Sequence, residues 1–431
     1  MWRCPLEITS PHDRSVIGRA AQTQPVDVDR AVAAARASFG AGAWRTTPLG
    51  ERIAVLRRFN ALREEDAEKV AHLISQENGS AGWFTRAGQP GLTRQAEACL
   101  KAAEEFGWEE TLMPSDPASP VRSVVRREAV GVVAAVIPWN SPFSSATAKI
   151  IPALLVGNSV VLKVSPENSL SMGFLAELLE RSGLPEGVIS VLPADRETSE
   201  YLVSHREVDK IAFTGSTRAG RRIASIAGER LKRVSLELGG KSAAIILPDA
   251  DIDEAVAGLK FGSLLNNGES CIAQTRILAP RSRYEEVVMA LKERIDEDAR
   301  LVTGGPQIPE GLEKGNYVTP TVFADVDNSM RIAQEEIFGP VLVVIAYEDE
   351  DEDEAVRIAD DSEYGLSGGV WSADEAHALA VARRLHTGTV TVNGAPVAFD
   401  GPFGGFKASG IGREYGAVGL GTYTECKTIT V

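Results

Sequence analysis

Apolar residues at helical spacing dominate the first hundred positions of the chain. The alanine-rich segment Val26–Phe39 follows a proline and predicts a helix. Glu51–Ser75 is a longer amphipathic run that stops before Asn78-Gly79, a pair typical of helix C-termini, and the helical pattern resumes through about Phe106. The chain therefore opens with predicted helices.

A polar break follows these helices. Residues 113–120, MPSDPASP, form a linker rich in proline and serine, and Val121–Arg127 then alternates apolar and basic residues as an exposed strand does. We expect this strand to pair with the strand that follows it as a protruding hairpin, and Thr422–Val431 to form a terminal strand. Because an isolated hairpin is only marginally stable, these strands favour contact with a partner subunit.

From Gly131 onward, continuous apolar runs alternate with amphipathic ones. The predicted strands are Gly131–Ile137, Ser159–Lys163, Val188–Leu192 and Lys210–Phe213, and the predicted helices are Ser144–Leu155, Leu170–Arg181, Glu197–Val203 and Ser216–Ile226. Such alternation indicates βαβ units and a doubly wound parallel sheet covered on both faces. A second α/β region runs from Glu237 to about Ala398, and the seven acidic residues 348–354 within it are interpreted as a solvated face or loop.

Composition and charge exclude several classes of protein. With 431 residues, 44% hydrophobic and 24% charged, the chain is an ordinary globular protein long enough for two or three domains. Its 45 basic and 60 acidic residues give a net charge of −15, which disfavours binding to nucleic acid or to anionic membranes. The longest apolar stretch, Ala129–Trp139, is too short to span a bilayer, and no signal peptide is visible.

The positions of the cysteines and histidines argue against disulfides and metal binding. Cys4, Cys99, Cys271 and Cys426 lie far apart and the five histidines are isolated, so we expect no disulfide framework and no metal site. Scattered cysteines are typical of a reduced, cytoplasmic protein in which a special cysteine serves as a nucleophile.

Two segments are suited to binding a nucleotide and to donating a hydrogen bond into a crevice, although each has a plainer structural explanation. The G-x-G-x-x-G fingerprint is absent, but FTGSTRAG at 213–220 leads from a strand into a helix, where a glycine and a helix N-terminus admit a phosphate or simply make a tight turn. PWNSPF at 138–143 places Asn140 after a strand, where its carboxamide can donate a hydrogen bond into a crevice or merely satisfy a turn.

Two further segments offer a base and a nucleophile. In LELGGK at 236–241, Glu237 is a candidate general base with a raised pKa, and a structural ion pair is the alternative. In NNGESCIAQTRILAP at 266–280, Cys271 lies in a polar turn that we expect to favour the thiolate, although most cysteines are inert.

Taken together, these segments resemble the NAD(P)-dependent aldehyde dehydrogenase superfamily. Further resemblance lies in VVLK at 160–163, EEIFGPV at 335–341, YGLSGGVW at 364–371 and PFGGFKASGIGRE at 402–414. The separation of 34 positions between Glu237 and Cys271 also matches the family pattern.

The resemblance implies an α/β fold with three parts. They are a doubly wound, Rossmann-like cofactor domain (residues 1–112 and 131–236), an α/β catalytic domain (237–412) and a small β oligomerisation hairpin (113–130 and 413–431). It also implies a homodimer or homotetramer whose substrate is a small-molecule aldehyde.

Roles for single residues follow from the same resemblance. Cys271 would attack the aldehyde to give a thiohemiacetal and then a thioester, Asn140 and the Cys271 backbone N–H would form the oxyanion hole, and Glu237 would activate the hydrolytic water to release a carboxylic acid. The implied cofactor is NAD, with NADP not excluded, and no metal is needed. The residues expected at the cofactor are Lys163 at the adenosine ribose, Gly215 and Ser216 at the pyrophosphate, Glu336 and Phe338 at the nicotinamide ribose, and also Ile137, Pro138, Trp139, Leu238 and Gly239.

Two departures from the family pattern concern the cofactor. Cys271 and Glu335 are only 64 positions apart, fewer than in typical members, and the junction falls near Arg294–Arg300. The missing segment lies beside the cofactor in the family, so its loss would weaken cofactor binding, unless a stretch of chain is absent from the sequence itself. Pro166 occupies a position where a glutamate often favours NAD, with Glu167 next to it, which leaves NAD against NADP open with NAD preferred.

A third departure concerns the substrate. The helix after Asn140 carries Ser141, Ser144, Ser145 and Ala148 where the family often has bulky aromatics, while Phe143, Phe399 and Phe403 can supply apolar surface. We therefore expect a wide tunnel and a bulky or long apolar aldehyde; the alternative is that other side chains refill the space.

Two other functions remain as alternatives. An acylating relative would pass the thioester to coenzyme A, but such relatives generally lack the base that Glu237 represents. A catalytically impaired scaffold protein would follow from the shortened region, but it would have no physical need to keep Cys271, Asn140 and Glu237 together. Dependence on coenzyme A, or failure to bind NAD(P), distinguishes these alternatives.

Overall fold

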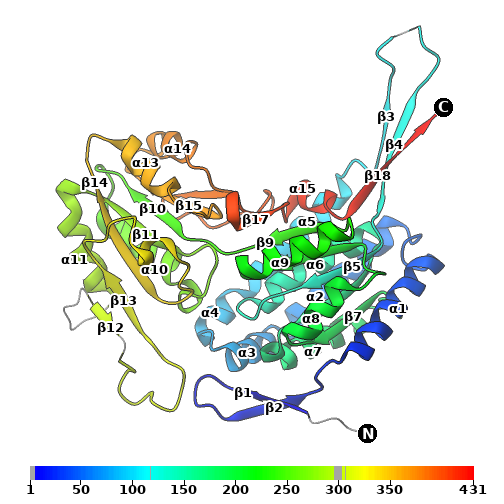
Figure 1. Cartoon of the computed structure of the whole chain (residues 1–431), viewed down its shortest axis with the longest axis horizontal. Helices are drawn as coiled ribbons and strands as arrows, with labels where there is room; N and C mark the ends of the chain where they lie inside the picture. The colour runs from blue at the N-terminus through cyan, green and yellow to red at the C-terminus, as the bar shows by residue number, and fades with distance from the viewer. Residues whose placement is uncertain (1–4, 117, 296–302, 306) are drawn as a thin grey trace.

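A computed structural model of the chain shows two α/β bodies side by side and a long hairpin that projects from one of them (Figure 1). The structure describes residues 5–116, 118–295, 303–305 and 307–431. At the start of the chain, β1 (Leu6–Thr9) and β2 (Val16–Ala20) form a small antiparallel hairpin below the two bodies.

The first body contains the predicted doubly wound sheet, with strand order β17-β9-β8-β5-β6-β7. Its parallel strands are β5 (Val132–Val136), β6 (Ser159–Val164), β7 (Ile189–Pro193), β8 (Lys210–Thr214) and β9 (Arg233–Glu237). The short β17 (Gly410–Ile411), from near the end of the chain, pairs antiparallel with β9.

Helices cover both faces of this sheet. One core includes α2 (Leu49–Glu65), α3 (Ala67–Asn78), α5 (Gln89–Glu104), α6 (Pro142–Val156) and α7 (Ser169–Arg181), and the other includes α1 (Pro25–Ala41), α8 (Arg196–Ser204) and α9 (Thr217–Glu229). Val133 and Ala135 of β5 enter the first core, whereas Val132 and Ala134 enter the second. This alternation explains why a strand buried on both faces reads as a continuous apolar run.

The single long helix predicted over Glu51–Ser75 is wrong, because the segment forms two helices. Asp66 ends α2 and begins α3 with φ −96° and ψ 19°, outside helical geometry. Its carboxylate pairs with Arg181, which holds the break against α7. The predicted C-cap is confirmed, since Gly79 adopts φ +78° after α3. A short helix, α4 (Gly82–Ala87), then leads into α5.

The second body is built on a seven-stranded sheet with order β12-β13-β14-β11-β10-β15-β16. Strands β10 (Ser242–Ile246), β11 (Gln274–Pro280), β13 (Thr319–Phe323), β14 (Val341–Tyr347), β15 (Ser367–Trp371) and β16 (Thr389–Val392) are parallel, and β12 (Thr303–Gly305) is antiparallel to β13. Helices α10 (Ile252–Leu264) and α11 (Tyr284–Ile295) pack on one face, and α12 (Arg331–Gln334), α13 (Glu352–Asp360) and α14 (Glu375–Ala382) pack on the other. Most of the predicted junction at 294–300 lies outside the described residues.

The projecting hairpin differs from the prediction. Strand β4 (Ser123–Ala129) pairs with the preceding β3 (Glu109–Leu112) and with the terminal β18 (Thr424–Thr430), not with the strand that follows it. The next strand, β5, belongs to the first sheet because the chain changes direction at Gly131, which has φ +132° and leaves no room for a Cβ beside Asp209. The sequence of β3, EETL, lacks the apolar alternation that predicts a strand.

Candidate active site

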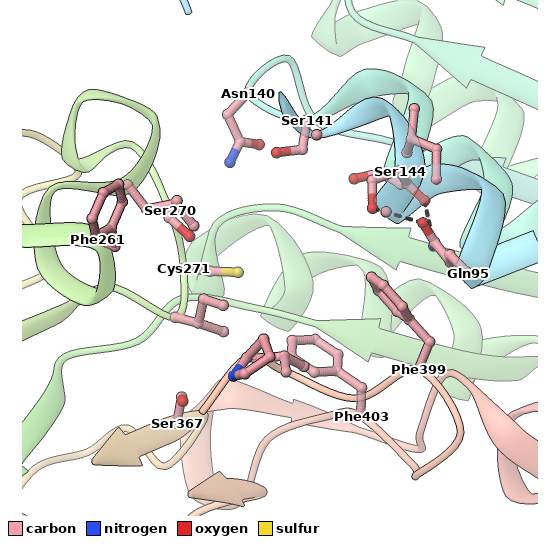
Figure 2. A pocket seen from close by; sticks show the side chains of 18 of the residues that line it. Gln95, Asn140, Ser141, Ser144, Phe261, Ser270, Cys271, Ser367, Phe399 and Phe403 are labelled. Atoms are coloured by element: carbon pink, nitrogen blue, oxygen red, sulfur yellow. Dashed lines mark hydrogen bonds between the residues drawn. The ribbon is translucent and has the colours of Figure 1, made fainter. Parts of the chain in front are cut away.

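A cavity of about 580 Å³ lies between the two bodies and brings together the predicted chemical residues. Its walls include Cys271, Glu237 and Asn140, which come from three separate segments of the chain. In Figure 2 the sulfur of Cys271 points into the space between Asn140 and the phenylalanines of the opposite wall. The prediction that these three residues share one site agrees with this geometry.

Two glycines allow the catalytic loops to meet. A Cβ at Gly240 would overlap the backbone oxygen of Cys271, and a Cβ at Gly239 would overlap the carboxylate of Glu336. The backbone N–H of Gly240 donates a hydrogen bond of 2.9 Å to Glu336 Oε1. The LELGGK segment therefore needs glycines because the cysteine loop and the Glu336 segment both pack directly against it.

Asparagine side chains fix Asn140 beside the cysteine loop. Asn140 Nδ2 donates to the Glu269 carbonyl at 2.8 Å. The backbone carbonyl of Asn140 accepts hydrogen bonds from Asn78 Nδ2 at 3.1 Å and from Asn266 Nδ2 at 3.0 Å. The carboxamide of Asn140 is thus held at the cavity wall, next to the backbone that carries Cys271.

The thiol of Cys271 does not have the environment that the sequence predicted. Burial, together with the nearby carboxylates of Glu336 and Glu237, raises its pKa to about 12. The expected polar, thiolate-favouring turn is therefore wrong for this structure, because the turn places the sulfur inside a cavity with acidic neighbours. A proton must leave before the sulfur can act as a nucleophile.

Glu237 has the raised pKa predicted for a general base. The side chain is 3% exposed, and among the described residues neither carboxylate oxygen has a hydrogen-bond partner. Burial raises its pKa well above the usual range, Glu414 adds to this effect, and Lys149 and Arg413 oppose it. The alternative of a structural ion pair does not describe Glu237, because its neighbours Lys149 and Glu414 pair with each other.

Sequence reasoning missed that buried pair. Lys149 Nζ contacts both Thr214 Oγ1 and Glu414 Oε1, and it is buried in α6 among apolar residues. A lysine inside an apolar helix indicates a buried partner, so the signal was present in the sequence. The partner is Glu414, the last residue of PFGGFKASGIGRE, and both Thr214 and Glu414 line the cavity.

The predicted cofactor residues gather at the carboxyl ends of four neighbouring strands. Ile137, Pro138 and Trp139 follow β5, Lys163 lies in β6, Gly215 and Ser216 follow β8, and Leu238 and Gly239 follow β9. Ile137 and Leu238 are buried in the two cores, so only their backbone atoms can face a ligand. The edge of a parallel sheet where strands end is where nucleotides bind in such folds.

The groups at this edge fit a dinucleotide. Ser216 Oγ caps α9 by accepting from the Ala219 N–H at 3.3 Å. The N–H groups that precede Ala219 in the first turn have no intrahelical partner, as at any helix start, and can donate to a phosphate. Lys163 is half-buried, and loss of hydration lowers its pKa to about 8, while Glu167 and Asp195 oppose the shift. Phe338 has φ +59° and its ring lies edge-on to Trp139 at 5.9 Å, beside Glu336.

The opposite part of the cavity has one hydroxyl-bearing wall and one aromatic wall. Ser141, Ser144 and Ser145 line it from the start of α6, as predicted, whereas Ala148 is buried and is not among its lining residues. Gln95 of α5 accepts from Ser144 Oγ at 3.0 Å. Phe399 and Phe403 stand across the space from these groups (Figure 2), and Phe143 also contributes to the lining.

The described part of the chain has neither a metal-binding cluster nor a membrane-spanning helix. No group of three His, Cys, Asp or Glu side chains there is arranged to hold a metal ion. No helix in the same part of the chain is both long and apolar enough to cross a membrane. Cys99, Cys271 and Cys426 are free thiols.

Comparison with known proteins finds relatives that are dehydrogenases of aldehydes. The model of the aldehyde dehydrogenase family matches residues 3–298 and 290–429. The chain is 42% identical to the geranial dehydrogenase of Castellaniella defragrans, over 98% of this chain and 94% of that protein. It is 39% identical to a putative aldehyde dehydrogenase, DhaS, of Bacillus subtilis, over 95% and 89% of the two chains.

Solved structures agree with the sequence relatives. A Mycobacterium tuberculosis aldehyde dehydrogenase complexed with NAD+ superposes with a TM-score of 0.94 at 40% identity, covering 99% of this chain and 94% of that one. A mutant of aldehyde dehydrogenase C from Pseudomonas syringae, complexed with NAD+ and octanal, gives a TM-score of 0.89 at 37% identity, covering 99% and 93%.

The comparisons also bear on the shortened region. The family match comes in two pieces that overlap at residues 290–298, close to the predicted junction. The alignment with the geranial dehydrogenase spans 456 positions, more than the 431 residues of this chain, so that relative carries residues for which this chain has no counterpart.

Proposed function

This chain belongs to the aldehyde dehydrogenase family, and from that premise we propose that it oxidises a bulky or long apolar aldehyde to the carboxylic acid, with NAD+ as the preferred electron acceptor. Oxidation of an aldehyde with a nicotinamide cofactor is the reaction of the family and of this chain. The observation that carries the proposal is that one cavity holds Cys271, Asn140 and Glu237, next to a sheet edge suited to a dinucleotide.

In the proposed mechanism, Cys271 gives up its proton to solvent water and its sulfur attacks the carbonyl carbon. A C–S bond forms, and the former carbonyl oxygen becomes an oxyanion that accepts hydrogen bonds from the Asn140 amide and the Cys271 backbone N–H. A nicotinamide held at this sheet edge would supply the acceptor for the hydride that leaves the former carbonyl carbon, and the adduct would then be a thioester. Lys163, the N-terminus of α9 and Glu336 are the groups that would hold this cofactor.

Hydrolysis then depends on Glu237. Its carboxylate takes a proton from water while the water oxygen attacks the thioester carbon; the C–S bond breaks and the sulfur leaves as thiolate. The absence of a hydrogen-bond partner for either carboxylate oxygen among the described residues supports this role, because both oxygens are available to a water molecule. The raised pKa supports it as well, since a stronger base removes the proton more readily.

The substrate class is supported by the cavity and by two relatives. The lining is mainly apolar: Phe399 and Phe403 face small serines, and Phe143 also contributes. Geranial and octanal, named for a relative and for a neighbour's ligand, are both apolar aldehydes of medium length. A site of this kind gains binding free energy from each methylene group that it removes from water.

The test is formation of reduced cofactor by the purified full-length protein, with short, long-chain and aromatic aldehydes and with either NAD+ or NADP+. We expect long or bulky aldehydes to give the higher kcat/KM, NAD+ to be preferred, and a Cys271→Ala variant to be inactive. A clear preference for acetaldehyde would contradict the substrate class. Turnover that requires coenzyme A would establish the acylating alternative. A protein that neither turns over an aldehyde nor binds the cofactor would establish the scaffold alternative.

The cofactor preference has its own variant. Glu167 is exposed one position after Pro166 and accepts a hydrogen bond from Ser165 Oγ, so its charge stands near Lys163. We expect this carboxylate to disfavour the 2′-phosphate of NADP+. Glu167→Ser should therefore raise kcat/KM with NADP+ relative to NAD+, and an unchanged ratio would show that Glu167 does not set the preference.

A further inference from the structure

Two exposed aromatic side chains from different bodies meet beside the cavity. Trp83 of α4 is 61% exposed and Phe261 of α10 is 58% exposed. Their ring centroids are 6.3 Å apart with planes at 83°, and Trp83 also contacts the ring of Phe84 edge-on at 5.9 Å. We call Trp83, Phe84 and Phe261 the aromatic rim.

The rim is continuous with the cavity that contains Cys271. Phe84 and Phe261 both belong to the cavity wall, and Trp83 contacts each of them from outside. Figure 2 shows Phe261 on the same side of Cys271 as Ser270, away from Phe399. The apolar lining of the cavity therefore extends outward to a solvent-exposed tryptophan.

Exposed large aromatics need an explanation, because burying them would stabilise the protein. Neither ring belongs to one of the buried cores, so they contribute little to the fold. Charged residues, Arg86 and Lys260, lie near them in sequence and are exposed, so the apolar surface is narrow. An apolar patch with a polar border next to a cavity is typical of a ligand site.

We propose that the aromatic rim is an outer subsite for the aldehyde, where the part of the substrate farthest from the carbonyl lies against Trp83 and Phe261. This inference rests on the proposed function, because it needs an apolar aldehyde that enters the cavity with its carbonyl at Cys271. The two rings offer too little surface for a stable protein interface, which buries about 800 Å² on each partner. A short chain of methylene groups fits such a surface.

The subsite makes specificity depend on chain length. A short aldehyde occupies only the inner cavity and does not contact Trp83, whereas a long one gains contact with the rim. In the wild type, kcat/KM should therefore keep rising with each added methylene group of the aldehyde. In a variant that lacks the tryptophan, this rise should stop at a shorter chain length.

The experiment measures kcat/KM for saturated straight-chain aldehydes from propanal to dodecanal in the wild type, Trp83→Ala, Trp83→Phe and Phe261→Ala. We expect the ratio of kcat/KM for dodecanal to that for propanal to fall about tenfold in the two alanine variants, a loss that corresponds to two buried methylene groups. Trp83→Phe should recover most of the ratio. Phe323→Ala removes an exposed aromatic of β13 outside the cavity lining and should leave the ratio unchanged.

A binding measurement separates this inference from the proposed function. In the Cys271→Ala background, which cannot form the thiohemiacetal, calorimetric titration with dodecanal should show weaker binding when Trp83 is also replaced by alanine. If the wild type oxidises no aldehyde, the proposed function fails, and this titration still decides whether the rim binds an apolar chain. The outer subsite would be overturned if the variants lost kcat/KM equally at every chain length, or if neither kcat/KM nor dodecanal binding decreased. A change of oligomeric state on Trp83→Ala without weaker binding would assign the rim to a second copy and overturn it too.

Discussion

At the scale of single residues, the chemistry depends on charges that the chain keeps out of water. Glu237 is buried without a partner among the described residues, Lys149 and Glu414 pair beside it, and Cys271 is surrounded by carboxylates. In the proposed mechanism Cys271 loses a proton and Glu237 gains one, so these charges affect separate steps. Variants that change one charge at a time should therefore separate the steps.

The first prediction concerns Glu237→Gln. The amide cannot accept a proton from water, so the thioester should form but not hydrolyse. We expect a burst of reduced cofactor of about one equivalent per active site, followed by a steady rate about 10²- to 10⁴-fold below the wild type, the range typical of general-base loss. Rapid-mixing absorbance shows the burst, and mass spectrometry of the quenched protein shows the acyl group on Cys271. Loss of the burst itself would mean that Glu237 acts before the thioester forms.

The second prediction concerns the pH at which hydrolysis of the thioester becomes fast, and it follows from the charges beside Glu237. The negative charge of Glu414 raises the pKa of Glu237, and the positive charge of Lys149 lowers it. Hydrolysis needs the deprotonated carboxylate, so its rate rises with pH. Glu414→Gln should shift this rise to lower pH, and Lys149→Met should shift it to higher pH.

Both substitutions break the same buried ion pair, so both should reduce stability by several kcal/mol. A merely structural effect would move the pH profile of thioester hydrolysis in the same direction in the two variants. Opposite shifts, measured on folded protein by single-turnover hydrolysis, would confirm the electrostatic origin, and parallel shifts would contradict it.

Residue-level prediction from sequence succeeded where a motif places a side chain at a strand end. Asn140 and Glu237 follow or end strands of one parallel sheet, so their shared edge was predictable, and Cys271 reaches them by the loop before β11. The raised pKa of Cys271 was not predictable, because it depends first on burial of the thiol and then on Glu336, which lies 65 positions further along the chain. Spacing along a sequence gives no measure of burial or of distant charges.

At the scale of elements, loops rather than helices or strands set the geometry of the site. The loop before Cys271 passes through Asn266 and Asn267, with φ +51° and +62°, and then Gly268, with φ +75°. A Cβ at Gly268 would overlap the backbone at Gly339, which follows Phe338. The cysteine loop and the cofactor-side loop are thus in direct backbone contact at one glycine.

The third prediction follows from this contact. Gly268→Ala must move one of the two loops, and a displacement of about 1 Å at an active site costs on the order of 10² in rate. We expect kcat/KM to fall by about that factor while the protein stays folded. Gly173→Ala in α7 is the matched control, because no atom lies within 4 Å of its Cβ and its backbone is helical, so activity should not change. A similar loss in both variants would contradict the loop-contact argument.

Element prediction failed where short segments take their structure from partners. β3 is a strand because β4 pairs with it, and the break at Asp66 is accompanied by a contact with Arg181 of α7. By contrast, the acidic run at 348–354 agrees with the predicted solvated face or loop, because none of its residues is buried. Its second half begins α13, where Asp351 caps the helix by accepting from the Glu354 N–H and Glu352 pairs with His377.

At the scale of the whole molecule, the site belongs to neither body alone. The first body contributes the sheet edge and Glu237, the second contributes Cys271 and Phe261, and the last segment of the chain returns to the first body with Glu414 before it ends in β18. The overall α/β architecture was predictable from alternating strands and helices. The cavity between the bodies was not, because its volume depends on how the two bodies pack.

The last prediction concerns the three-stranded sheet β18-β4-β3, which projects from the first body (Figure 1). Leu112, Val121 and Ile429 are large apolar residues left exposed on or beside it. A narrow sheet with exposed apolar residues is marginal by itself, so we propose that it docks on a second copy of the chain to form a dimer or tetramer. Leu112→Glu with Ile429→Glu places charges on that contact and should shift the sedimentation coefficient to that of a monomer. Val16→Glu, an equally exposed valine on the separate β1–β2 hairpin, is the matched control and should leave the assembly intact. A wild type that sediments as a monomer at every concentration would disprove this role for the sheet without affecting the proposed chemistry, since each residue assigned to that chemistry comes from a single chain.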